Sequence, residues 1–118
     1  MKAIISVSRT GSIFGAVEKQ LAGSRQGRSP DFRLSFESAR SLFSELTPAR
    51  LDLLDTLRRV GPCSIYALAK ASERNYSNVH TDVTRLEELG LVERSEEDNS
   101  ISVPFESIEI LVPLAQVA

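Results

Sequence analysis

The stretch from Ser64 to Gly90 constrains this chain most, because its pattern predicts two helices separated by a short polar turn. Ser64 is a favoured N-cap residue, and a helix of about two turns is expected after it. Three apolar residues recur at helical spacing in that first helix: Ile65, Leu68 and Ala69. The turn is expected over residues 71–74, and the longer second helix over about 76–89 before Gly90 ends it.

A further helix is expected before this pair. Thr47 and Pro48 form a typical helix start, because threonine caps the first turn and proline is tolerated at the first helical position. The helix should cover residues 48–60 and end at Gly61-Pro62. Four residues are expected to face the core: Leu53, Leu54, Leu57 and Val60.

A β-hairpin is expected after the pair of helices. Residues 91–95 and 100–105 resemble strands, and the tip between them, residues 96–99, is acidic. Pro104 places its strand at a sheet edge or marks the strand end. Helix-turn-helix followed by a hairpin is the plan of many DNA-binding domains. We therefore expect an α+β protein with a winged helix-turn-helix domain at 47–104, built as a three-helix core plus a β-hairpin wing.

The second helix of the pair has two different faces. Three apolar residues should pack against the preceding helices: Val79, Val83 and Leu86. Asp82 lies near the core edge and is expected to make a structural hydrogen bond. The outer side carries short hydrogen-bonding side chains bracketed by arginines, and these are the expected DNA contacts: Arg74, Asn75, Ser77, Asn78, His80, Thr81, Thr84 and Arg85. Because any surface helix is polar outside, this polar face alone does not indicate DNA binding. The helices before it and the hairpin after it favour the DNA-binding interpretation.

Residues 1–46 are expected to form an N-terminal strand-helix-strand extension. Residues 3–7 form a β-branched run and residues 31–36 alternate strictly, so both predict strands, with a helix over about 12–23 between them. A short helix over 38–45 should turn Leu42, Phe43 and Leu46 toward the core. The extension either pairs with itself across a two-fold axis as a dimerisation arm or covers the core of its own chain.

The charge distribution leaves two interpretations of the N-terminal arm open. Residues 1–30 carry five basic residues against one acidic residue, so this arm either touches phosphates or is an ordinary solvated surface. The formal net charge of the whole chain is −2, which does not suit a generally basic nucleic-acid binder. The tail at 105–118 is compatible with a strand or a short helix and could contact a dimer mate or another partner.

Other functional classes find little support. Cys63 is the single cysteine and His80 the single histidine, so a disulfide within the chain is excluded and a zinc site lacks ligands. The P-loop, GxGxxG and HExxH motifs are absent. We therefore expect no enzyme, no cofactor and no metal. The N-terminal residues lack the pattern of a signal peptide and no apolar run reaches membrane-spanning length, so a cytoplasmic location without membrane contact is expected.

The segments SIYALA at 64–69, RNYSNVHTDV at 74–83 and LEELGLV at 86–92 resemble the winged helix-turn-helix proteins grouped with MarR-like regulators. Together with VPFESI at 103–108, they are also similar to small prokaryotic predicted DNA-binding proteins that include predicted antitoxins. The resemblance covers about residues 46–110. It implies a homodimer that binds double-stranded DNA as a transcriptional regulator, most simply a repressor.

The same resemblance assigns roles to two elements. The 76–89 helix would be the recognition helix in the major groove, and residues 91–104 would be the wing. Two features depart from the family pattern: Thr81 stands where related proteins often carry a basic residue, and the wing tip is acidic, which opposes contact with phosphates. Two alternatives stay open, an antitoxin that also binds a cognate toxin, and a winged-helix adaptor that binds protein without binding DNA.

Overall fold

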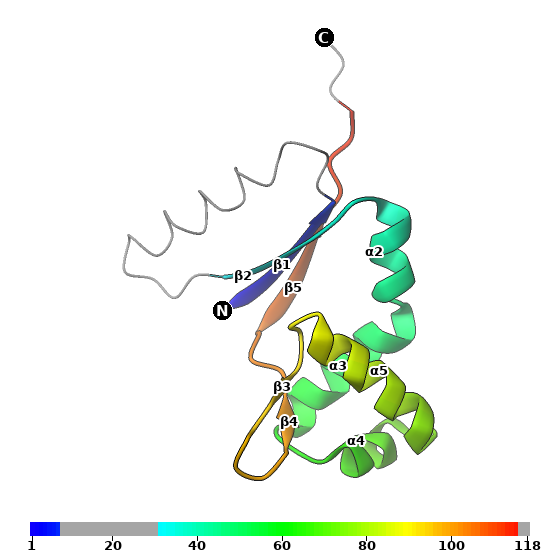
Figure 1. Ribbon diagram of the computed structural model, residues 1–118, viewed down its shortest axis with the longest axis vertical. Coiled ribbons are helices and arrows are strands. Elements are labelled where there is room, and N and C mark those ends of the chain that lie inside the picture. Colours follow the sequence, from blue (N-terminus) through cyan, green and yellow to red (C-terminus); the bar gives the residue numbers. More distant parts are fainter. Residues whose placement is uncertain (8–30, 116–118) are drawn as a thin grey trace. The chain divides into compact units, whose positions relative to one another are not determined.

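The computed structural model describes residues 1–7 and 31–115, which form four helices and two small sheets in an α+β arrangement (Figure 1). The chain divides into two compact units. The first combines residues 1–45 with residues 105–118, and the second is the continuous segment Leu46–Pro104. No helix in the described part is long and apolar enough to cross a membrane.

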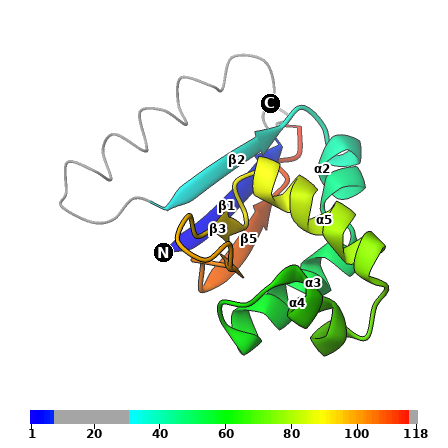
Figure 2. The same ribbon diagram turned by 60° about the horizontal axis from the view of Figure 1, so that its bottom comes forward.

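The first unit contains a three-stranded parallel sheet. Its strands are β1 (Lys2–Val7), β2 (Phe32–Phe36) and β5 (Ser107–Leu111), with β1 in the centre and parallel to both neighbours (Figure 2). The strands predicted near both ends of the extension are therefore confirmed. Part of the tail expected at 105–118 is β5, so it adds a strand to the N-terminal extension instead of standing apart from it.

The register of this sheet separates a uniformly apolar face from a mixed face that carries most of the polar side chains, because successive residues of a strand point to opposite faces. One face carries Ala3, Ile5, Val7, Phe32, Leu34, Phe36, Ile108 and Ile110. On the other face Lys2 pairs with Glu109 (Nζ–Oε1 3.3 Å), and the hydroxyl oxygens of Ser6 and Ser35 are 3.5 Å apart. Ala3 and Ile5 are fully buried, so the centre of this unit lies at β1.

Helix α2 (Ala39–Glu45) contacts β1 and β2. Leu42 is fully buried, but Phe43 is 52% exposed, so the prediction that Phe43 faces the core is wrong. Successive residues of a helix are rotated by about 100°, so Phe43 does not share the direction of its buried neighbour Leu42. Leu46, four residues after Leu42, is buried as predicted. The helix expected at 12–23 and most of the basic arm lie outside the described residues.

The second unit begins with α3 (Pro48–Val60), whose start agrees with the predicted cap. The Thr47 hydroxyl accepts a hydrogen bond from the Arg50 backbone N–H at 3.2 Å. Gly61, with φ at 82°, ends the helix in a backbone conformation that favours glycine. Leu53, Leu54 and Leu57 are buried as predicted. Val60 is 50% exposed, contrary to the prediction, because it is the last helical residue and neighbouring elements no longer cover it.

Two helices joined by a three-residue turn follow, α4 (Ile65–Ser72) and α5 (Tyr76–Glu88). Ser64 caps α4, its hydroxyl accepting from the Ala67 N–H at 3.0 Å. Helix α4 contacts both α3 and α5. The predicted core residues are buried: Ile65, Leu68, Ala69, Val79, Val83 and Leu86. The two helical predictions are therefore confirmed, to within a residue or two at each end.

A short antiparallel hairpin closes the second unit. It consists of β3 (Glu93–Arg94) and β4 (Ile101–Ser102), both shorter than the predicted strand runs. Cys63, in the loop between α3 and α4, joins the hairpin through two backbone hydrogen bonds with Ile101, at 3.1 and 2.8 Å. Four hairpin residues complete the core of this unit: Leu91, Val92, Ile101 and Val103.

Candidate nucleic-acid interface

The turn between α4 and α5 fixes where α5 begins. Glu73 ends α4 in a left-handed conformation, with φ at 54°, and its N–H donates to carbonyls of the last turn. The Asn75 side-chain oxygen then accepts from the Ser77 N–H at 2.9 Å, the Ser77 hydroxyl at 2.7 Å and the Asn78 N–H at 3.4 Å. This oxygen satisfies helix N–H groups that would otherwise lack partners. Asn75, expected to contact DNA, is therefore first of all the N-cap of α5.

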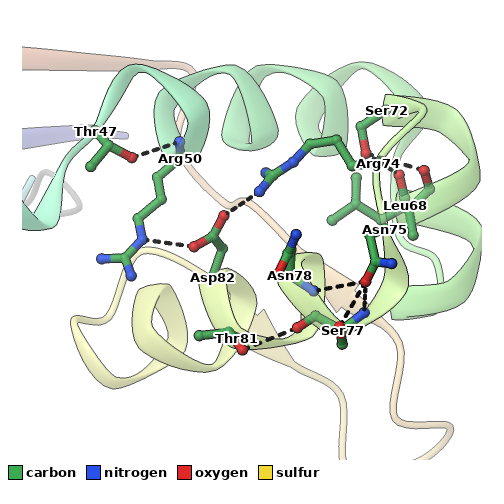
Figure 3. Close-up of polar contacts among 11 residues, drawn as sticks. Thr47, Arg50, Leu68, Ser72, Arg74, Asn75, Ser77, Asn78, Thr81 and Asp82 are labelled. Atoms are coloured by element: carbon green, nitrogen blue, oxygen red, sulfur yellow. Dashed lines mark hydrogen bonds and ion pairs between the residues drawn. The ribbon is translucent and has the colours of Figure 1, made fainter.

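Three charged residues tie α5 to α3 and to the turn (Figure 3). Asp82 of α5 accepts from Arg50 Nε of α3 at 3.0 Å and from Arg74 Nη2 of the turn at 2.8 Å. The three side chains are only 17%, 15% and 29% exposed for Arg50, Asp82 and Arg74. We call them the Asp82 cluster. The structural hydrogen bond predicted for Asp82 is confirmed, and the cluster holds α5 in place from two sides.

The electrostatics of the Asp82 cluster favour the charged form of Asp82. Burial raises the pKa of this carboxyl, but hydrogen bonds and charges from Arg74 and Arg50 outweigh burial and hold the pKa below its usual value. The Arg74 Nη1 atom is buried without a hydrogen-bond partner among the described residues, so Asp82 is the main compensation for the Arg74 charge. Arg74, expected to contact DNA, therefore acts in this structure to orient α5.

The outer face of α5 carries the remaining polar side chains expected at the interface. Five of them are exposed: Ser77, Asn78, His80, Thr81 and Thr84. The threonine hydroxyls donate back to the helix, from Thr81 to the Ser77 carbonyl at 3.0 Å and from Thr84 to the His80 carbonyl at 2.8 Å. Their oxygens can still accept hydrogen bonds from outside. The surface is thus a row of short donors and acceptors on one rigid helix.

Asn78 and His80 differ from the hydroxyl residues on this face. No hydrogen bond to the Asn78 side-chain amide occurs within the described residues, so this amide can both donate and accept toward a ligand. The His80 ring lies beside Tyr76, with ring centroids 5.9 Å apart and planes inclined by 44°. Tyr76 is 50% exposed, so this aromatic pair adds ring surface beside the polar side chains at the first turn of α5.

Carboxylates accompany the cations at the other end of α5. Arg85 Nη1 lies 2.9 Å from Glu88 Oε2, and Arg94 of the hairpin holds Glu87 with Nη2–Oε1 at 2.8 Å. Arg94 Nε adds two further contacts of 3.2 Å to the same carboxylate. Arg85, expected to contact DNA, is therefore already paired with a neighbouring carboxylate.

The second unit as a whole is acidic. Residues 46–104 contain ten acidic residues against seven basic ones. Every arginine of this unit makes a hydrogen bond or ion pair: Arg50, Arg58, Arg59, Arg74, Arg85 and Arg94. Lys70 of α4 lies over the Tyr66 ring, with Nζ 5.6 Å from the centroid. Five of these arginines hold carboxylates, whereas Arg58 donates to the Val103 carbonyl. A polyanion would have to displace a carboxylate before it could use any of those five.

The described residues offer little for metal or nucleophilic chemistry. Across residues 1–7 and 31–115, no group of three or more His, Cys, Asp or Glu side chains could hold a metal ion. Cys63 is half-buried, and burial raises the pKa of its thiol, which disfavours the reactive thiolate. His80 lies on the outer face of α5.

Residues 45–110, more than half of the chain, match the HVO_A0114 family, and the chain belongs to this family. The match covers all of the second unit and continues into β5. No curated protein and no solved structure matches the chain. The family membership thus groups the chain with its relatives without assigning an activity.

Two contacts at the site were missed by sequence reasoning. Arg50 lies 32 residues before Asp82, and no local pattern links the two. Glu87 and Arg94 meet across the bend from α5 into the hairpin, which periodicity does not predict. By contrast, the Arg85–Glu88 pair has the i,i+3 spacing of helical neighbours and could have been found from the sequence.

Proposed function

We propose that the second unit is a winged helix-turn-helix and that the protein is a sequence-specific transcriptional regulator, acting as a homodimer on double-stranded DNA. Three features support this assignment: the three-residue turn between α4 and α5, the β3–β4 hairpin after α5, and the backbone bridge from Cys63 to Ile101. A short α4, a short turn and a longer α5 are the parts of a helix-turn-helix, and the hairpin supplies the wing.

The observation that carries the proposal is the exposed polar row on α5 above a helix held by the Asp82 cluster. Ser77, Asn78, Thr81 and Thr84 follow one another at spacings of one or three residues along one side of a 13-residue helix. Such a helix is about 20 Å long and fits the major groove. Short hydroxyl and amide side chains there can bond to base edges, and a rigid mounting keeps their spacing matched to the bases.

A homodimer would compensate for the small number of phosphate contacts that one acidic second unit can make. Because residues 46–104 are acidic overall, one copy gains little from the phosphate backbone. Two copies on a two-fold axis double both the base contacts and the phosphate contacts, and they require a palindromic site. A dimer bound over a promoter would exclude polymerase, so repression is the simplest mode of regulation.

Replacing Asn78 by alanine is expected to weaken binding to the preferred duplex by about 5–100-fold, the range for losing one good base contact. The duplex can be selected from a random library with the purified protein, together with DNA upstream of its own gene. Binding is then measured by electrophoretic mobility shift. Arg59→Ala on α3 is the control, because its side chain is 69% exposed and pairs with Asp55 one turn away in the same helix. Equal losses in both variants would argue against α5 as the reading element.

The wild-type protein provides the decisive result. A duplex selected above background and shifted at low salt supports the regulator, with affinity falling as salt rises because phosphate contacts release counterions. If neither library selection nor the upstream DNA gives a shift at low salt, the DNA-binding proposal fails.

Replacing Glu88 by glutamine is expected to tighten duplex binding by roughly 2–5-fold at low salt, in line with the strength of exposed ion pairs. Glu88 holds Arg85 at 2.9 Å, and its replacement removes one carboxylate that competes with a DNA phosphate for the guanidinium. The gain should shrink at high salt, because screening weakens both interactions. Unchanged or weaker binding would show that Arg85 does not approach the DNA backbone.

A protein-binding adaptor is the second candidate function. The acidic balance of residues 46–104 and the paired arginines favour it, since both disfavour a polyanion and suit a basic protein partner. An antitoxin would combine the two functions, repressing its operon and binding a cognate toxin. Failure of every duplex in the shift assay would favour the adaptor, and a small neighbouring reading frame whose product co-purifies with this chain would favour the antitoxin.

A further inference from the structure

The outer edge of β5 is an open strand edge with apolar side chains. Within the described residues β5 pairs only with β1, so its other side carries no strand. Ile110 is 37% exposed and Leu111 60% exposed, and the apolar character continues past the strand end into Val112, at 37%. The opposite edge strand, β2, differs because most of its side chains are half-buried. The sheet is thus least covered along β5.

An open apolar edge is unusual in a protein that stays monomeric. Its free N–H and C=O groups can add another strand, and natural edges are normally blocked by lysine, proline or a bulge. In β5 the only charged residue is Glu109, and Pro113 lies beyond the strand end. Nothing in the strand itself therefore prevents pairing with a second strand of similar composition.

We propose that β5 pairs antiparallel with β5 of a second copy, on a two-fold axis at Ile110, so that two three-stranded sheets join into one. Residues opposite each other across an antiparallel pair lie on the same side of the sheet. The two-fold axis must therefore lie midway between two copies of the same residue. An axis at Ile110 places Ile110 opposite its own copy, Ile108 opposite Val112, and Glu109 opposite Leu111. The apolar faces of the two sheets then become continuous.

The neighbouring registers are worse for electrostatic and backbone reasons. An axis at Glu109 would place two carboxylates directly opposite each other, and like charges across a pair are destabilising. An axis at Leu111 would bring Pro113 into the interior of the ladder opposite Glu109, where proline has no N–H to donate. An axis at Ile110 leaves Pro113 in the last pair, opposite Ser107 at the start of β5. The interface belongs to the homodimer of the proposed function, but it needs no DNA, so the two can fail separately.

A pair of lysine substitutions tests the interface and its register together. Ile110→Lys would place two like charges on the axis, and the dimer dissociation constant should rise about tenfold or more. Leu111→Lys should leave the dimer intact or tighten it, because this register sets position 111 opposite Glu109 of the partner subunit. Light scattering after size-exclusion chromatography, over about 1–100 µM, gives the mass of each variant. Equal effects of the two substitutions would overturn the register.

If Ile110→Lys disturbs folding, disulfide cross-linking provides a second test of the β5–β5 interface. In a Cys63→Ser background, which lacks native cysteine, Ile110→Cys should form a disulfide-linked dimer on mild oxidation, because opposite Cβ atoms in such a pair are about 5 Å apart. Ser107→Cys, exposed at the start of β5, lies far from its own copy in this register and should stay monomeric on a non-reducing gel.

Each outcome of these experiments has a separate meaning. A wild-type protein that is monomeric throughout the concentration range overturns both the homodimer and this interface. A dimer that survives Ile110→Lys and gives no disulfide through position 110 overturns the interface alone. A cross-linked dimer that shifts no duplex supports the interface and counts against the DNA-binding function.

Discussion

Replacing Asp82 by alanine is expected to lower the free energy of unfolding by roughly 2–4 kcal/mol, because two largely buried guanidinium groups would lose their shared carboxylate. The Arg74 Nη1 atom already lacks a hydrogen-bond partner among the described residues, so this atom offers no other contact to compensate for the lost carboxylate. Urea denaturation followed by circular dichroism at pH 7 measures the change. Asp55→Ala is the matched control, since Asp55 is 80% exposed and pairs with Arg59 within one helix. It should change stability little.

The pH dependence gives an independent test of the same cluster. Arg74 and Arg50 hold the pKa of Asp82 below its unfolded value despite burial, so the folded state binds this proton less readily than the unfolded state does. The stabilisation is therefore complete above the unfolded pKa of about 3.9 and is lost as the pH falls through the lower folded pKa. Asp82→Asn should be less stable at neutral pH and should show a weaker decline in acid. Parallel stability profiles for the two proteins would contradict this role.

Reversing the charge of the hairpin tip is expected to give the largest gain in DNA affinity. Glu96→Lys with Glu97→Lys should tighten duplex binding by about tenfold or more at low salt and steepen the salt dependence, because each new phosphate contact releases counterions. Both glutamates are exposed in the wild type. Asp98 should be left unchanged, because its carboxylate accepts the Ser100 N–H at 3.0 Å and shapes the tip.

Two controls separate a local contact from a general charge effect. Glu96→Gln with Glu97→Gln removes the repulsion without adding cations, so it should give a smaller gain. Asp52→Lys changes the charge at an exposed position of α3, away from the hairpin in sequence. Equal tightening by Asp52→Lys would mean that net charge alone is responsible. No change in the tip variant would mean that the tip stays far from the duplex.

The helices of the second unit could be predicted because their signals are local. Thr47 and Ser64 cap the helices that they precede, and the apolar spacing of α5 selected the residues that are buried. Phe43 and Val60 were misplaced because apolar residues at helix margins and ends are covered only if a neighbour reaches them. Sequence periodicity does not contain that information.

The rest depends on residues far apart in the chain. Strand β5 pairs with β1 although about a hundred residues separate them, and its short alternating run was compatible with either a helix or a strand. On α5 the exposed polar row was predictable from the helical wheel. The engagement of Arg74 by Asp82 was not, because it requires the fold of the turn and of α3.

The order of the strands in the chain has a consequence for synthesis on the ribosome. The second unit is continuous, so it can fold as soon as residue 104 has emerged, whereas β1 cannot complete its sheet until β5 follows. Throughout that interval Ile5 and its apolar neighbours on β1 lack one of their two flanking strands. Premature termination between residues 105 and 111 would therefore release a chain with a complete second unit and an unfinished, aggregation-prone sheet.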